Sequence, residues 1–305
     1  MTQTARDQGL ENIKGMAFVF ISTVFFASMH ALIKQVSNDM HPFEVAFFRN
    51  LFGVLVFIPV FLRHGIRPFH TKRPGLMVVR AAINSIAMLS FFLALALAPL
   101  ADVAALNFMA PIFATMMAPF FLKEKVGWRR WTAILVGLGG AFLILRPGFG
   151  SMDIGHLLVV VSALSWAIVL IVIKIMSRTE SALTITLYMV VLMTPISAVP
   201  AVFYWTWPDW QTLGWLAVIG MVGTLGQYLM AEGLRRGDTA VVMPLDFFKL
   251  VWATLLGIVV FGEVPDSFTY AGGFVIFLSA TYIALRERAL RKEPALPVAR
   301  TPGQG

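Results

Sequence analysis

A few charged side chains stand inside long apolar stretches of this sequence, where a charge is costly and therefore rare. Asp246 and Lys249 are the clearest case, because residues three apart share one face of a helix. They could form an internal ion pair that fixes helix packing, or one of them could handle a proton or a charged substrate. Arg49 has Glu44 and Asn50 nearby in the sequence. Structural pairing is favoured there over contact with a substrate.

Further polar and aromatic residues in the apolar stretches could line a substrate cavity. Arg80, Asn84 and Met88 follow one another at four-residue spacing, so they share a helical face. That face either lines a cavity or lets Arg80 reach the membrane interface. His30 could titrate near neutral pH or could simply be hydrogen-bonded. The remaining candidates for holding an amphiphilic solute are Asn107, Trp166, Gln227 and Tyr228.

The composition places these residues in a membrane protein. Of 305 residues, 58% are hydrophobic and 13% are charged, and the mean hydropathy is +0.80. Soluble domains are about half apolar and a quarter charged. Runs of about 20 apolar residues recur along the chain, which is the length of a helix that crosses the hydrocarbon core. The basic residues behind the net charge of +8 form short clusters between these runs, which indicates membrane orientation and no nucleic-acid partner.

Apolar runs separated by charged residues or by Gly and Pro predict ten membrane-spanning helices. Their predicted ranges are 13–33, 43–62, 75–97, 102–122, 128–145, 155–174, 182–204, 212–231, 240–261 and 267–285. If the N-terminus is cytoplasmic, most of the 24 Lys and Arg residues fall in cytoplasmic segments. This distribution follows the positive-inside rule, so both termini are predicted to be cytoplasmic.

The chain contains an internal repeat of five predicted spans. An offset of about 140 residues aligns Lys34 with Lys174 and Glu124 with Glu263. Because five is an odd number, the second copy enters the membrane from the opposite side, and the halves are inverted repeats. Kinks that a moving gate would need are predicted in the fourth and ninth spans, at Pro111, Pro119 and Pro244.

The predicted fold class is an all-α integral membrane protein, with ten transmembrane helices forming two inverted five-helix repeats around a central cavity. The predicted segments are a cytoplasmic N-terminal segment at 1–12, the first repeat at 13–146, the second repeat at 155–286 and a disordered cytoplasmic tail at 287–305. The chain has no cysteine, which excludes disulfides and thiolate metal sites. No metal, cofactor or obligate protein partner is predicted.

Each half opens with an aromatic residue before alanine, at Phe26 and Trp166, and each has an apolar stretch that ends in glutamate, at Glu124 and Glu263. With these motifs in two tandem five-helix units, the sequence resembles the EamA group of the drug/metabolite transporter superfamily. The resemblance covers residues 13–286 and implies a ten-helix inverted-repeat fold with a central cavity in a bacterial inner membrane. It also implies a transporter, because exporters of amino acids and related metabolites are frequent among bacterial members. The usual tryptophan of the first span is Phe26 here.

The predicted function is secondary transport of a small amphiphilic metabolite by alternating access, with amino-acid export as the first candidate from the resemblance. The sequence has no Walker A pattern, so no nucleotide-driven motor is recognised. A channel or facilitator is the first alternative, although a two-fold repeat favours rocking halves. A membrane enzyme is the second alternative, but HExxH and GxSxG motifs are absent and no enzyme is predicted. The expected partners are the small-molecule substrate and the lipid bilayer.

Overall fold

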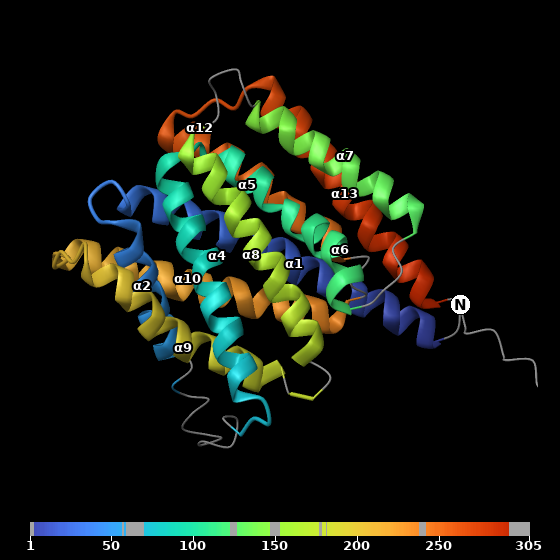
Figure 1. Cartoon of the computed structure of the whole chain (residues 1–305), viewed down its shortest axis with the longest axis horizontal. Helices are drawn as coiled ribbons and strands as arrows, with labels where there is room; N and C mark the ends of the chain where they lie inside the picture. Colours follow the sequence, from blue (N-terminus) through green and yellow to red (C-terminus); the bar gives the residue numbers. More distant parts are fainter. Residues whose placement is uncertain are drawn as a thin grey trace, which may run out of the picture.

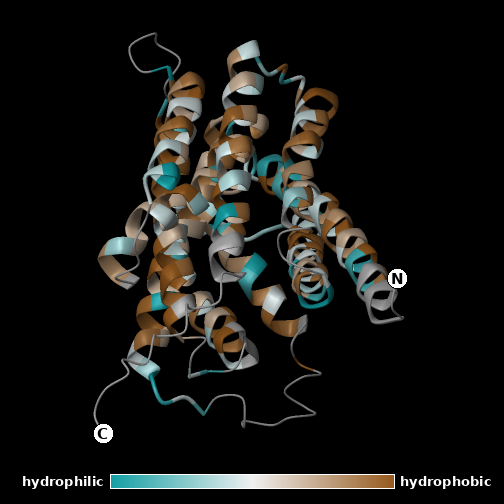
Figure 2. Cartoon of the chain, turned by 90° about the vertical axis from the view of Figure 1, so that its right-hand side faces the viewer, coloured by the Kyte–Doolittle hydropathy of each residue, from teal (hydrophilic) through white to brown (hydrophobic). Residues whose placement is uncertain are grey.

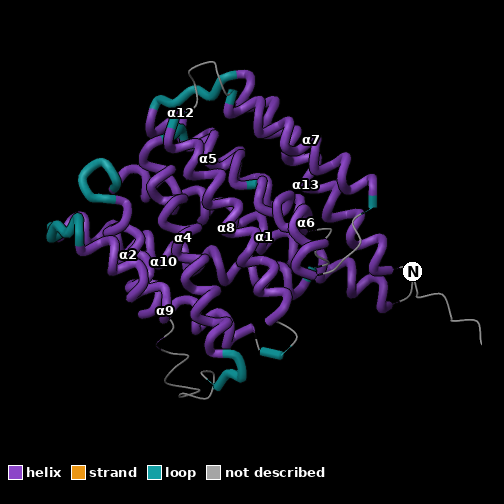
Figure 3. Tube along the Cα trace, viewed as in Figure 1, coloured by secondary structure: helices purple, strands orange, loops and turns teal. Residues whose placement is uncertain are grey.

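The computed structural model describes residues 3–56, 58, 70–122, 127–146, 153–176, 179–180, 182–237 and 242–292. Within these ranges every regular element is a helix (Figure 3). In chain order the elements are α1 (Gln3–Val36), α2 (Pro42–Val56), α4 (Pro74–Leu97), α5 (Leu100–Asn107), α6 (Met109–Leu122), α7 (Trp128–Leu145), α8 (Ile154–Met176), α9 (Ala182–Val202), α10 (Trp210–Arg236), the 3-10 helix η2 (Met243–Phe247), α12 (Phe248–Phe261) and α13 (Ser267–Lys292).

These elements form ten spans, because two of the spans are divided. The fourth span consists of α5 and α6, and the ninth consists of η2 and α12. In the described part of the chain, eight spans are long and apolar enough to cross a membrane. The described part of α2 is shorter, and α9 contains a shorter apolar stretch at Leu187–Val202. The predicted all-α fold with ten transmembrane helices is confirmed.

Helical structure continues at both ends of the chain beyond the apolar spans. Helix α1 begins at Gln3, so the segment predicted at 1–12 is helical and continuous with the first span from there on. Glu11 in this segment forms ion pairs with Lys14 and with Arg236 of α10. Helix α13 continues to Lys292, beyond the predicted start of the tail at 287–305, and the rest of that range lies outside the described residues. Charged residues with good helix propensity extend both helices past the apolar runs.

The helices pack mostly with partners from the other half of the chain. α1 packs along α10, α4 along α8, and α7 along α13 (Figure 1). The beginning of α1 and the end of α13 lie together at the right of Figure 1, and we call this side the terminal face. The opposite side, where α1 ends and α8 begins, is called the far face. Apolar residues are spread over the surfaces of the helices, as lipid contact requires (Figure 2).

The pair α7 and α13 depends on glycine for its close approach. A Cβ added at Gly140 would lie 2.8 Å from the carbonyl oxygen of Gly272. We therefore expect Gly140→Ala to force the two helices apart and to lower the free energy of unfolding by about 1–3 kcal/mol. A lower thermal midpoint in detergent would report this loss. Gly139→Ala is the matched control, because a Cβ there meets no atom within 4 Å; an equal loss in both variants would contradict the close-packing argument.

Candidate functional site

A cavity of about 210 Å³ lies where the two halves meet. Its lining comes from α1, α2, α4 and α5 of the first half and from α8, α9, α10 and α12 of the second. The volume is below the roughly 300–1,000 Å³ of sites for drug-sized ligands, which indicates a small solute. The sequence candidates that line the cavity are His30, Arg49, Asn84, Met88, Asn107, Trp166, Gln227 and Lys249.

The lining follows the internal repeat. An offset of about 140 residues relates Phe26 to Trp166, and both aromatic rings lie in the cavity wall. The same offset relates Arg49 to Met189, which also lines the cavity. Each half therefore contributes an aromatic ring from the same position, whereas only the first half contributes a cation at the second position. The lining therefore repeats an aromatic ring but not a positive charge.

Arg49 enters the cavity without an acidic partner. Its Nη1 donates a hydrogen bond to Oδ1 of Asn50 at 3.1 Å, and Asn50 donates in turn to the hydroxyl of Ser197 at 3.1 Å. No carboxylate among the described residues lies within ion-pair distance of Arg49. Glu44, its expected neighbour, is five residues earlier on α2 and accepts a hydrogen bond from the backbone N–H of Thr206 at 2.6 Å. Five residues correspond to a rotation of about 140°, so the two side chains leave α2 on different faces.

Lys249 is neutralised by one neighbour and covered by another. Its Nζ lies 2.5 Å from Oδ1 of Asp246 and 4.9 Å from the centre of the Phe26 ring. Asp246 is buried and lies against a second, smaller cavity of about 130 Å³ between the fourth, ninth and tenth spans. The ion pair that the spacing allowed is thus formed. Because Lys249 already has a carboxylate partner, Arg49 carries the unpaired positive charge of the cavity.

The breaks in the two divided spans meet next to this site. Phe108 separates α5 from α6, and Phe247 ends η2 directly before α12. The rings of these two repeat-related residues lie 5.1 Å apart. Pro111 lies in the first turn of α6, and Pro244 lies in the first turn of η2. A proline is tolerated there, because the first N–H groups of a helix have no partner within the helix. Pro119 lies inside α6, further from the break. Discontinuous spans at the repeat interface are typical of substrate sites in transporters.

Three sequence candidates lie outside the lining: Asp246, which faces the second cavity, Tyr228 and Arg80. Tyr228 is 63% exposed on the outer surface of the bundle, because one residue after Gln227 the helix has turned by about 100°. Arg80 is buried behind the wall, where its Nη1 donates to the carbonyl oxygen of Ile185 at 3.0 Å. Its Nη2 lies 3.5 Å from Sδ of Met189, so Arg80 supports a lining residue without entering the cavity.

Several lining residues were not anticipated from the sequence. They are mostly apolar or small and therefore carry no polar signal inside a span: Phe26, Met29, Ala87, Phe91, Phe92, Ser162, Met189 and Met193. The repeat alignment could have found Met189 from Arg49, and it pairs Phe26 with Trp166. The methionines add a flexible, polarisable surface that suits solutes of irregular shape.

Comparisons with known proteins show which proteins this chain is similar to. The model of the EamA-like transporter family matches residues 13–146 and 153–285, which confirms the two predicted repeats. An S-adenosylmethionine uptake transporter of Rickettsia bellii is 27% identical over 90% of this chain and 94% of its own. A riboflavin transporter of Vibrio cholerae is 31% identical over 88% of this chain and 89% of its own. The pseudopaline exporter CntI of Pseudomonas aeruginosa is 26% identical over 87% of this chain and 94% of its own.

A solved structure supports the fold. A crystal structure of a protein that is 19% identical to this chain matches it with a TM-score of 0.61. The match covers 90% of this chain and 98% of the other chain. At this identity the likeness concerns the arrangement of the helices and carries no information about the solute.

Proposed function

The chain belongs to the EamA-like transporter family, and from this premise we propose that its cavity carries a small carboxylate-bearing metabolite across the membrane by alternating access. The protein is a multi-pass membrane transporter of small metabolites and is not an enzyme. Amino acids are the first candidates for the substrate, and export is the proposed direction. The unpaired Arg49 in the cavity wall carries this proposal.

The charge of the cavity favours an anionic group on the substrate. A buried cation without a counter-charge is costly in a membrane, and a substrate carboxylate that binds Arg49 removes that cost. Lys249 adds no net charge because Asp246 neutralises it. A positively charged solute without an anionic group would be repelled by Arg49.

The rest of the lining suits an amphiphilic molecule. Asn84, Asn107 and Gln227 offer amide donors and acceptors on different sides of the cavity. Phe26 and Trp166 face the cavity from the two halves and can hold an apolar side chain between aromatic surfaces. An amino acid with an apolar or aromatic side chain presents both kinds of group within the available volume.

The proposal is tested with the purified protein in liposomes. Labelled phenylalanine, methionine, riboflavin and S-adenosylmethionine are compared with and without a proton gradient, and protein-free liposomes serve as the control. We expect flux of the amino acids and competition by other carboxylates, but no competition by amino-acid amides. Flux of riboflavin, which has no carboxylate, without amino-acid flux would refute the substrate class. Flux of S-adenosylmethionine alone would refute amino acids as the first candidates. A fluorescent reporter fused after Arg288 establishes whether the terminal face is cytoplasmic, which the export direction needs.

A further inference from the structure

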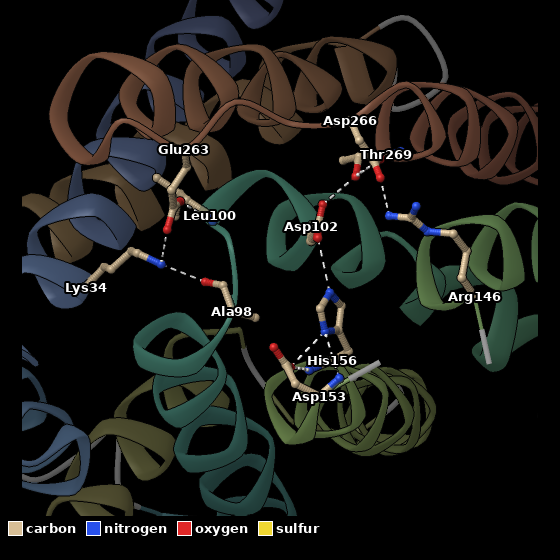
Figure 4. Close-up of polar contacts among 10 residues, drawn as sticks. All are labelled: Lys34, Ala98, Leu100, Asp102, Arg146, Asp153, His156, Glu263, Asp266 and Thr269. Atoms are coloured by element: carbon tan, nitrogen blue, oxygen red, sulfur yellow. Dashed lines mark hydrogen bonds and ion pairs between the residues drawn. The ribbon is translucent and has the colours of Figure 1, made fainter. Parts of the chain in front are cut away.

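A polar cluster joins several spans at the far face (Figure 4). It contains two groups of contacts, one around Lys34 and one around His156. Neither group lines the substrate cavity in the described part of the chain. What the cluster does is therefore a separate question from which solute the cavity binds.

The Lys34 group connects α1 with the ninth span and with the α4–α5 connection. Lys34 Nζ lies 2.7 Å from Oε1 of Glu263 and donates to the carbonyl oxygen of Ala98 at 2.7 Å. Oε2 of Glu263 accepts a hydrogen bond from the backbone N–H of Leu100 at 2.9 Å. Lys34 is one helical turn beyond His30, which lines the cavity, so this group lies between the cavity and the far face. Glu124, the repeat counterpart of Glu263, lies outside the described residues.

The second group is built around a buried histidine with two acidic neighbours. His156 Nδ1 lies 2.8 Å from Oδ1 of Asp153, and Nε2 lies 3.1 Å from Oδ2 of Asp102. The other oxygen of Asp102 accepts a hydrogen bond from the hydroxyl of Thr269 on α13 at 2.6 Å. Only 6% of the His156 side chain is exposed, whereas half of the Asp153 side chain is. The ring thus connects α8 to α5, and through Thr269 to α13.

This geometry favours a proton on both ring nitrogens. A carboxylate only accepts hydrogen bonds, and a neutral imidazole donates from one nitrogen alone. In a neutral ring with Nε2 protonated, the lone pair of Nδ1 would face the Asp153 oxygen at 2.8 Å. The backbone N–H of Asp153 does not resolve that conflict, because it is 3.5 Å from Nδ1. An imidazolium ring between Asp102 and Asp153 satisfies both carboxylate contacts.

The other charged groups near the ring are already paired. Thr269 also binds Asp266, from its backbone N–H at 2.9 Å, and Asp266 forms an ion pair with Arg146 after α7. Lys34 and Glu263 neutralise each other. Among the described residues, Asp102 on α5 and Asp153 before α8 are thus the charges that the ring itself contacts. A proton on His156 balances one of the two, and its loss leaves two carboxylates beside a lone pair.

We propose that His156 is a proton-binding switch that holds the far-face gate of the transporter closed. When both nitrogens are protonated, the ring ties α8 to α5 and, through Thr269, to α13, which closes the cavity toward the far face. When the ring loses one proton to solvent beside the half-exposed Asp153, one of its two hydrogen bonds breaks. The repulsion between carboxylate and lone pair then favours separation of α8 from α5. Opening of the far face is thereby coupled to release of a proton.

The absence of native cysteines allows a direct test on the purified full-length chain. Ile154 at the start of α8 and Val264 between α12 and α13 are both exposed, so Ile154→Cys and Val264→Cys together accept a pair of spin labels. Pulsed electron resonance then measures their separation without substrate, between about pH 5 and pH 8, where histidine changes charge. We expect one short distance at the acidic end and a longer distance whose population rises at least about fivefold toward the basic end.

Two variants and one control assign the effect to His156. His156→Gln keeps a polar side chain that cannot titrate, so the distances should no longer respond to pH. Asp153→Asn retains a good N-cap for α8 but removes one acidic neighbour, so the transition should move to lower pH. His41→Gln is the matched control, because His41 lies at the same face in a stack with Tyr204 and outside the cluster. It should leave the pH response unchanged.

The result is independent of the substrate proposal, because no solute is present. Distances that do not change with pH in the parent protein would overturn the switch. A persistent pH response in well-folded His156→Gln would overturn it as well, and so would an unshifted transition in Asp153→Asn. Failure of amino-acid transport in liposomes would leave these distances unaffected, so the two proposals fail separately.

Discussion

Arg49→Met is expected to remove the preference of the transporter for a carboxylate over the corresponding amide. A charge-assisted hydrogen bond contributes about 1.5–3 kcal/mol, so the affinity for the carboxylate substrate should fall about tenfold to a hundredfold. The affinity for the amide should change little. The folded state should tolerate the substitution, because Arg49 has no carboxylate partner among the described residues that would be left unpaired. Competition assays in liposomes measure both affinities.

Arg80→Met is the matched control for this prediction. Arg80 is also an arginine inside a span, but it is bound to the carbonyl oxygen of Ile185 behind the wall. Its loss should lower the thermal midpoint and leave the preference for carboxylates intact. If Arg80→Met abolished the preference and Arg49→Met preserved it, the assignment of the substrate carboxylate to Arg49 would be wrong.

The span count followed from the sequence because the bilayer imposes a simple length rule. Each span needs about 20 apolar residues, and breaks such as 98–101 and 262–266 stand out by their polar or Pro content. The two divided spans were indicated by Pro111 and Pro244, although the break at Phe108 carries no signal of its own. The repeat followed from matching residues at a constant offset. These features depend on local composition, which a single sequence displays directly.

The hydrogen-bond partners of the polar residues could not be predicted from the sequence, because they depend on how the helices pack. Glu44 and Arg49 are close in sequence, yet Glu44 binds Thr206, which lies more than 150 residues away along the chain. Asp102 and His156 stand at the ends of two spans, where polar residues are ordinary. Only the packing of α5 against α8 brings them together. Tyr228 shows the same limit within one helix, since the sequence did not indicate which of two adjacent residues faces inward.

The structure also changes which of the two cations in the cavity is the better candidate to bind the substrate. From spacing alone, Lys249 was a candidate ligand for the substrate and Arg49 was expected to be paired. In the structure Lys249 is bound by Asp246 and covered by Phe26, whereas among the described residues Arg49 hydrogen-bonds to the amide of Asn50 and has no carboxylate partner. A cation that is already neutralised would have to release its partner before it could bind a substrate. Lys249 is therefore better placed to fix the ninth span against α1 than to bind the substrate.

The double variant Asp246→Asn with Lys249→Met decides between these roles. Lys249→Met alone leaves the buried Asp246 carboxylate unpaired, which should cost about 3–5 kcal/mol of folding free energy or force the carboxyl group to take up a proton. The double variant removes both charges and should recover most of that loss, since replacing a whole buried pair is often near neutral. Thermal midpoints and liposome flux are measured for each single variant and for the pair.

We expect the double variant to retain most of the parental transport rate, because its cavity still presents Arg49 to the carboxylate. The amide of asparagine keeps hydrogen-bonding capacity at position 246, and methionine fills nearly the same volume as the lysine stem beneath the Phe26 ring. A double variant that is as stable as the parent but does not transport would show that the Lys249 ammonium contacts the substrate. The positive charge of the cavity would then come from both cations, and Arg49→Met should be correspondingly milder.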